Sequence, residues 1–151
     1  MIKKVLLTGA ALLTAVTSAR ANLGWTYAQC ERQYGRPRQT EQKYGLTLVD
    51  WYSKRIYISV AFDADTEVSI SYIGRPSVLT PKLAAALMRK NAPGVQWDNE
   101  GENSDGTFQY VGYSGGQLSV YTLLSSPKPK IVKLRITKAS YNGRFDGGAQ
   151  R

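Results

Sequence analysis

The chain has 151 residues, with 20 Lys and Arg against 11 Asp and Glu, one cysteine and no histidine, and its formal net charge is +9 at pH 7. A single cysteine cannot form an internal disulfide, so the fold must rest on a hydrophobic core. The lack of histidine excludes Ser-His-Asp and Cys-His catalysis and every imidazole metal site.

Residues 1–21 have the features of a secretory signal peptide. Lys3 and Lys4 precede an apolar run over residues 5–16, and an Ala-Arg-Ala ending places small residues where signal peptidase cuts. The apolar run is too short to span a bilayer as a helix. We therefore predict an exported protein, periplasmic or secreted, with no transmembrane segment once the signal is removed.

Cleavage before residue 22 would leave 130 of the 151 residues, enough for one compact domain. Loss of Lys3, Lys4 and Arg20 lowers the net charge from +9 to +6. Export argues against nucleic acid as a partner. Anionic envelope polymers, lipid head groups and acidic proteins remain suitable partners for a basic chain.

The first element of the mature chain is a short helix over residues 26–34. Thr26 and Gln29 have the spacing of a capping box, in which each side chain bonds the backbone N–H of the other. Gly35 and then Pro37 mark its end.

Cys30 falls on the apolar stripe of this helix, together with Tyr27 and Tyr34. The residues before it, Tyr-Ala-Gln, are not those that precede a lipid-anchored cysteine. A reactive thiol needs exposure and a nearby cation. We therefore interpret Cys30 as a packed core side chain, and expect its replacement by serine to lower stability without affecting activity.

Period-two alternation predicts an antiparallel meander of three strands over residues 45–52, 55–63 and 66–73. The inward faces are expected to carry Ile56, Ile58, Val60 and Phe62 on the second strand, and Val68, Ile70 and Tyr72 on the third.

The second half of the chain repeats this order. Thr80 and Pro81 open a helix that ends near Asn91. A polar loop is predicted over 98–106, and three more strands follow at about 107–113, 117–124 and 131–138.

These elements predict one α+β domain over residues 22–140. Its antiparallel sheet has about six strands, arranged as two meanders, with two short helices packed on one face. The segments 22–74 and 78–138 are candidates for two similar halves, although their sequences do not establish a repeat. The glycine-rich segment 141–151 is expected to be a flexible tail.

The stretch from Gly24 to Pro37, GWTYAQCERQYGRP, resembles the start of the SmpA/OmlA envelope family, which includes the BamE-like lipoproteins. The β-lactamase-inhibitor proteins share the helix-then-meander unit, present twice. This resemblance implies two similar halves and protein binding rather than catalysis. The opening is also similar to that of short secreted bacterial proteins. Unlike the lipoproteins, the chain has no cysteine at the cleavage point, so we expect no lipid anchor. The matching residues are Gly24, Trp25, Thr26, Gln29, Cys30, Gly35 and Pro37.

Two acidic groups were considered as sites. The residues around 98–105 lack the glycine and bidentate glutamate spacing of a calcium loop, so a solvated loop is favoured. Asp63, Asp65 and Glu67 cluster at a hairpin tip, where water should keep carboxyl pKa values near normal and turn chemistry accounts for the aspartates. We predict no catalytic residue, no cofactor and no metal.

The candidate binding surface is the open face of the sheet. Exposed tyrosines beside basic residues are typical of interfaces, although aromatics also favour strands in general and lysines commonly guard edge strands. We predict a non-catalytic module that binds a partner protein through this face. The alternatives are an anionic envelope polymer or lipid bound by the basic last strand, and a carboxylate-based hydrolase. The candidate residues are Tyr57, Tyr110, Tyr113, Tyr121, Lys128, Lys130, Lys133 and Arg135.

Overall fold

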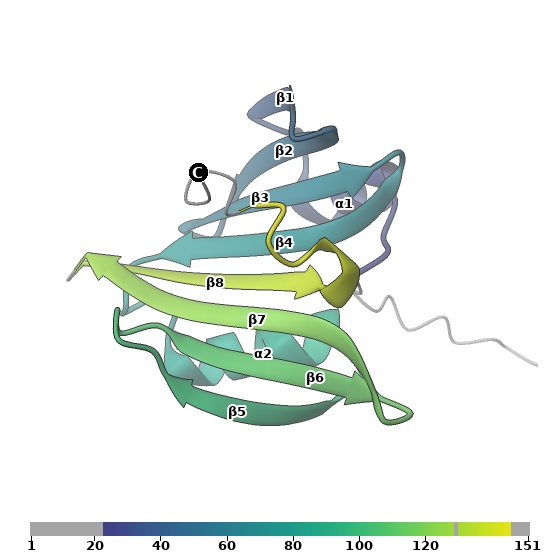
Figure 1. Cartoon of the computed structure of the whole chain (residues 1–151). Coiled ribbons are helices and arrows are strands. Elements are labelled where there is room, and N and C mark those ends of the chain that lie inside the picture. The colour runs from purple at the N-terminus through teal and green to yellow at the C-terminus, as the bar shows by residue number, and fades with distance from the viewer. Residues whose placement is uncertain (1–22, 129, 146–151) are drawn as a thin grey trace, which may run out of the picture.

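The computed structural model describes residues 23–128 and 130–145. The predicted signal peptide therefore lies outside the described residues. One antiparallel sheet of eight strands dominates, in the order β1-β2-β3-β4-β8-β7-β6-β5, with two helices behind it (Figure 1). The elements are α1 (Tyr27–Tyr34), β1 (Gln39–Lys43), β2 (Leu46–Ser53), β3 (Ile56–Asp63), β4 (Thr66–Gly74), α2 (Pro81–Asn91), β5 (Gln96–Glu102), β6 (Phe108–Ser114), β7 (Gln117–Lys128), β8 (Ile131–Lys138) and a 3₁₀ turn, η1 (Ala139–Tyr141).

Each helix precedes a meander of four strands, and the two meanders join where β4 pairs with β8. In Figure 1, α1 lies behind the part of the sheet built from β2 to β4, and α2 lies behind the part built from β5 to β8. The sheet is therefore continuous, although its two halves come from separate stretches of chain.

The predicted fold class is wrong in the size of the sheet, which has eight strands and not about six. The two additional strands are the edges, β1 and β5. All five residues of β1 are exposed. β5 runs from Gln96 to Glu102, and most of it overlaps the segment predicted as a polar loop over 98–106. Neither strand has an apolar face, so neither shows the alternation that reveals a strand. Backbone pairing with β2 and β6 defines them instead.

The α1 prediction is confirmed, including its capping box. The Gln29 N–H donates to Thr26 Oγ1 at 3.3 Å, and the Thr26 N–H donates to Gln29 Oε1 at 2.8 Å. Gly35 follows with a φ of +84°, a backbone conformation that favours glycine. The second helix begins as expected, with the Leu83 N–H donating to Thr80 Oγ1 at 3.2 Å and proline in its first turn.

The main core lies between the helices and the sheet, and Cys30 is part of it. Its side chain has 0% exposure, which confirms that it is a packed core residue. Burial raises the pKa of the Cys30 thiol far above its ordinary value, and the nearby Glu67 and Asp65 add to this effect. The thiol is therefore protonated and unreactive at neutral pH.

We expect Cys30→Ser to lower the free energy of unfolding by roughly 1–3 kcal/mol, because it places a hydroxyl in an apolar site. Urea unfolding of the mature chain measures this. Ala28→Ser is the matched control, since Ala28 is an exposed residue of the same helix. Equal stability of the two variants would contradict the role given to Cys30.

A β-bulge corrects the predicted faces of β4. Phe62 pairs with Glu67 and Ala61 pairs with Ser69, so Val68 has no partner opposite it. The extra residue reverses the alternation at this point. Val68 therefore packs on the face away from the helices and not, as predicted, with Ile70.

The sheet face opposite the helices carries a small second core. Leu46, Ala61 and Val68 are buried there beneath Tyr141 and Phe145. The Tyr141 hydroxyl also donates a hydrogen bond to the Asp63 carboxylate. We predicted a flexible tail from residue 141. The structure packs residues 141–145 against the sheet, and residues 146–151 lie outside the described residues.

Candidate functional site

A hollow of about 300 Å³ lies on the sheet face opposite the helices. We call it the sheet hollow. Its floor is made of small side chains on the central strands, including Ser59, Ser69 and Ser71. Larger side chains stand around them on β1, β2 and β8 and on the residues after η1. The hollow therefore exists because small residues occupy the middle of a sheet whose neighbours carry large ones.

The floor is held by strand pairing. Ser71 lies between Ser59 of β3 and Arg135 of β8 in the register. Ser69 is two residues before Ser71 on β4 and points to the same face. The hydroxyl groups of Ser69 and of Thr137 on β8 share a hydrogen bond of 2.8 Å. Residues 69 and 137 are far apart in sequence, so this site depends on the joining of the two meanders.

One wall of the sheet hollow is cationic. Lys133 and Arg135 are two residues apart on β8, so their side chains point to the same face of the sheet, and both line the hollow. The Arg135 guanidinium lies 5.8 Å from the centre of the Phe145 ring, within the range of a cation–π contact. The residues after η1 therefore help to place one of the two charges.

The opposite wall is aromatic and acidic. The Tyr57 hydroxyl donates a hydrogen bond to the Asp50 carboxylate, which lies on the neighbouring strand β2. Partial burial raises the pKa of Tyr57 to about 12, and this bond contributes to the increase. The Tyr57 ring is thus held as a neutral donor at the side of the hollow.

Two exposed tyrosines extend this wall toward the β1 edge. Tyr44 is 45% exposed and Tyr52 is 54% exposed. Each has a cation at its ring: Lys43 Nζ lies 4.9 Å from the Tyr44 centroid, and the Arg38 guanidinium lies 5.6 Å from that of Tyr52. Neither was among the predicted binding residues. Tyr44 lies at a turn, where there is no alternation to follow, and Tyr52 lies on the outer face of β2 opposite Tyr57.

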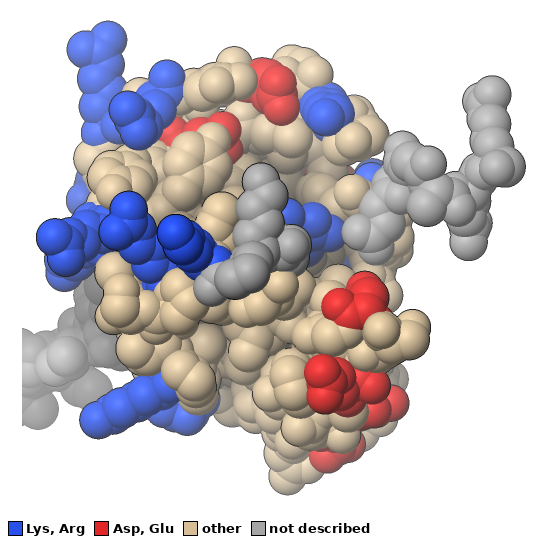
Figure 2. Space-filling view, turned by 90° about the vertical axis from the view of Figure 1, so that its left-hand side faces the viewer, with Lys and Arg blue, Asp and Glu red and all other residues tan. Residues whose placement is uncertain are grey.

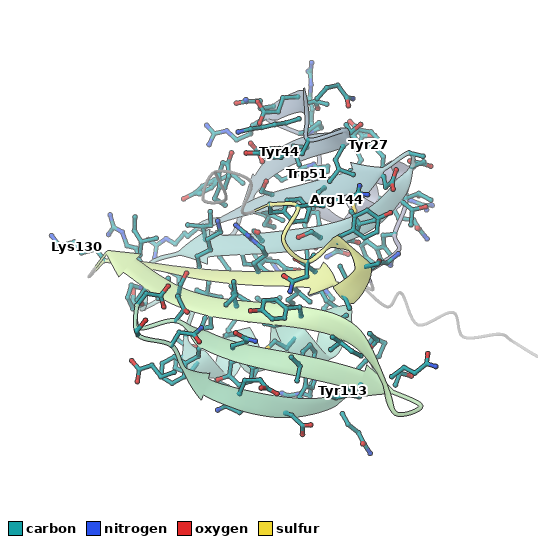
Figure 3. The ribbon with its side chains drawn as sticks, viewed as in Figure 1. Tyr27, Tyr44, Trp51, Tyr113, Lys130 and Arg144 are labelled. Carbon is teal, nitrogen blue, oxygen red and sulfur yellow. The ribbon has the colours of Figure 1, made fainter. Side chains whose placement is uncertain are left out.

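The structure brings together three of the eight predicted binding residues, namely Tyr57, Lys133 and Arg135. Tyr121 shares this face one strand further on, since it pairs with Thr137. Tyr110 lies on the other face, where it packs against the main core. Figure 3 shows Tyr113 and Lys130 at two distant points, Lys130 at the tip of the β7–β8 turn. The Lys128 side chain lies outside the described residues.

Glu67 does not lie at the solvated hairpin tip that the sequence predicted for it. The bulge in β4 turns it toward the helices, where it is only 2% exposed. Its backbone N–H donates to the Trp25 carbonyl at 2.8 Å. Its Oε1 atom has no hydrogen-bond partner among the described residues. A bulge has no signature in the sequence, so Glu67 was expected at a wet hairpin tip.

Burial raises the pKa of Glu67 to about 8, although a backbone hydrogen bond from Trp25 and the charge of Lys138 oppose the increase. The expectation of an ordinary pKa is therefore wrong for this carboxyl group. Beyond it, the Tyr72 hydroxyl accepts a hydrogen bond from Asn91 Nδ2 at 2.9 Å and lies 3.5 Å from the Tyr34 hydroxyl. These buried polar groups belong to the core and do not open onto the sheet hollow.

No family model and no curated protein matches the chain. A solved structure with a related arrangement is that of a cysteine-rich secretory protein from Staphylococcus aureus, with 14% sequence identity and a TM-score of 0.46. The similarity covers 78% of this chain and 44% of the other, so this chain spans less than half of that protein's length. Such a slight likeness assigns neither a family nor a function.

Across residues 23–128 and 130–145, no helix has both the length and the apolar character needed to cross a membrane.

Proposed function

We propose that the mature chain is an exported, non-catalytic module, periplasmic or secreted and not lipid-anchored, that binds a partner protein on the open face of its sheet. The sheet hollow carries this proposal, because it combines a concave floor with exposed tyrosines on one side and two cations on the other. Tyrosine and arginine are enriched among the residues that dominate binding energy at protein interfaces.

The two walls of the sheet hollow have different roles in the proposed binding. Tyr44 and Tyr57 offer rigid amphipathic rings that can bury area at small entropic cost. Lys133 and Arg135 favour an acidic partner and speed its approach, since charges at an interface affect association rate and specificity more than final affinity. The expected partner surface is therefore acidic, with an apolar projection that fits the hollow.

The contacts of the three hairpin carboxylates support a non-catalytic role. Asp63 accepts a hydrogen bond from the Tyr141 hydroxyl, and Asp65 Oδ1 accepts one from the backbone N–H of Tyr27 at 3.1 Å. Glu67 is enclosed in the core. Each carboxylate thus has a structural position, and none of the three is among the residues that line the sheet hollow.

A second candidate function is binding of an anionic envelope polymer or lipid, which the placement of Lys133 and Arg135 at the sheet hollow favours. The dependence of binding on salt concentration distinguishes this function from protein binding. Screening shortens the reach of exposed charges to about 10 Å at 0.1 M salt, so a polymer held by charge should be released as salt rises. An interface anchored by buried aromatic rings should persist.

To test the proposal, the tagged mature protein is isolated from its own cells at low and high salt, and bound molecules are identified by mass spectrometry. The partner's affinity is then measured for two variants. We expect Tyr44→Asn to weaken binding at least tenfold, because an aromatic anchor is lost. Asparagine is chosen because residue 44 has a φ of +58°, which asparagine tolerates. We expect Lys133→Gln with Arg135→Gln to slow association and reduce its salt dependence.

Matched controls lie elsewhere on the molecule. Leu118→Asn removes a side chain that is 45% exposed near the β6–β7 turn. Arg32→Gln with Arg36→Gln removes two exposed charges in and just after α1. Controls that weaken binding as much as the test variants, or bound glycan or lipid that leaves at high salt, would refute the protein-binding proposal.

A further inference from the structure

A second hollow lies at one end of the sheet, between the start of α2 and the strands β6, β7 and β8. We call it the end pocket. Its volume is about 230 Å³, and apolar side chains form most of its lining: Pro76, Leu79, Pro81, Phe108, Leu124 and Val132. Phe108, which lines this pocket, is 38% exposed and is one of four exposed large hydrophobic side chains among the described residues.

The end pocket is smaller than the sites that enclose whole drug-sized ligands, which are about 300–1,000 Å³. It can therefore hold a short stretch of hydrocarbon while the rest of the ligand stays outside. Among the lining side chains that the structure describes, only Ser125 and Ser126 are polar. None of these described side chains would compensate a buried charge, so the part of the ligand that contacts them must be apolar.

Two exposed cations are next in the chain to residues that line the end pocket. Arg75 directly precedes the lining residue Pro76, and Lys82 directly follows the lining residue Pro81; both side chains are exposed. The pocket faces the amino-terminal end of α2, whose first turn has no acidic residue and whose dipole adds positive potential. Figure 2 looks onto this end of the molecule, where Lys130 projects. Lys and Arg gather on its left-hand side, whereas Asp and Glu lie at the lower right and also among basic residues at the top.

Acidic residues lie on the other side, near the lining residue Gly106. The Asp105 carboxylate there accepts hydrogen bonds from the Thr107 N–H at 3.0 Å and the Thr107 hydroxyl at 2.7 Å. Glu102 is exposed nearby. Cations are therefore adjacent in the chain to the lining residues before and in α2, and the Asp105 carboxylate to the lining residue Gly106. This arrangement favours a ligand whose negative part lies toward Arg75 and Lys82.

We propose that the end pocket binds the hydrocarbon chain of a single-chain anionic amphiphile, with its head group at the Arg75 and Lys82 side. An apolar slot whose lining residues adjoin exposed cations in the sequence is complementary to such a ligand, which joins an apolar chain to a negative head. This site is separate from the sheet hollow and does not depend on the function proposed for it.

Isothermal titration of the mature protein tests this with two probes used below their self-association concentrations, decanoate and decyltrimethylammonium. They pair chains of equal length with opposite head charges. We expect one decanoate per chain, and binding of the cationic probe at least tenfold weaker. Absence of decanoate binding, or equal binding of both probes, would show that the pocket is not an amphiphile site.

Two variants locate the site. Phe108→Ser should weaken decanoate binding at least fivefold. Leu118→Ser removes a similarly exposed apolar side chain at the other end of the sheet and should leave decanoate binding unchanged.

Arg75→Gln with Lys82→Gln should weaken the binding of decanoate severalfold and leave the binding of neutral decanol unaffected. Arg32→Gln with Arg36→Gln is the charge-matched control. If Phe108→Ser fails to fold, the charge variants still decide. An unchanged ratio of decanoate to decanol affinity overturns the proposal.

Discussion

Glu67→Gln should remove most of the pH dependence of stability between pH 5 and pH 8. In the folded chain the pKa of Glu67 is raised from its ordinary value of 4.5 to about 8, chiefly by burial. Between these values the folded state keeps a proton that the unfolded state has lost, so stability falls as pH rises. The loss is complete above pH 8, where the folded carboxyl group also ionises.

A shift of one pKa unit corresponds to about 1.4 kcal/mol, so the upper limit for this loss is about 5 kcal/mol. The chain has no histidine, so no imidazole group titrates between pH 5 and pH 8 and adds to the change in stability. We therefore expect the free energy of unfolding of the wild-type chain to fall by several kcal/mol from pH 5 to pH 8, while that of Glu67→Gln stays nearly level.

The variant also has a cost that is independent of pH. Oε1 of Glu67 has no partner among the described residues. The protonated carboxyl group has one O–H donor, whereas the amide of glutamine has two N–H donors, so the variant buries one more donor without an acceptor. This should lower stability by roughly 1–3 kcal/mol at pH 5. The free energies of unfolding of the wild-type chain and of Glu67→Gln, plotted against pH, should consequently cross. Glu100→Gln, at an exposed position of β5, is the control and should keep the wild-type slope. An unchanged slope in Glu67→Gln would show that this carboxyl group titrates normally.

Trp51→Ala should cause the largest loss of stability among single substitutions on β2. The side chain has 0% exposure, and its Nε1–H donates to the Gly35 carbonyl at 2.8 Å. Its ring lies 6.2 Å from that of Tyr27 and 5.8 Å from that of Tyr34, centroid to centroid. Trp51 thus contacts both ends of α1 and holds the helix on the sheet. Deleting a buried ring of this size costs about 3–5 kcal/mol.

Urea unfolding followed by far-ultraviolet circular dichroism measures this loss without relying on tryptophan emission. Trp51→Phe keeps a ring and removes only the hydrogen bond and part of the volume, so it should cost clearly less and remain folded if the alanine variant does not. Tyr52→Ala is the control, because Tyr52 is the next residue and is 54% exposed. We expect it to change stability by no more than about 0.5 kcal/mol. Similar losses at positions 51 and 52 would contradict the anchoring role.

These two buried residues also bear on the proposed binding face. The sheet hollow is shaped by strand register, and the register is maintained by the core on the other side of the sheet. Glu67 lies at the bulge that shifts Val68 onto the face of the sheet hollow. We therefore expect loss of stability at these sites to reduce partner binding indirectly, whereas the variants of Tyr44 and of Lys133 with Arg135 act on binding at the surface.

The candidate site was only partly predictable. Alternation identified Lys133 and Arg135 as outward-facing, and placed Tyr57 opposite the inward face of β3. It could not separate Tyr110 from Tyr57, because an aromatic residue suits either face of a strand. It also could not show that β8 lies beside β4, since this pairing joins residues as far apart in the chain as Ser69 and Thr137.

The sequence by itself determined the elements whose information is local. Thr26 with Gln29 and Thr80 with Pro81 define the helix starts through short-range hydrogen bonds and backbone preference, and alternation defines the six strands with a buried face. Tertiary structure alone decided the edge strands, the bulge and the sheet hollow. The reason is physical: β1 and β5 are stabilised by hydrogen bonds to neighbouring strands, Glu67 is buried by a shift in register, and the hollow forms only where two distant meanders meet. All of these depend on how strands pair with one another, which the alternation within a single strand does not show.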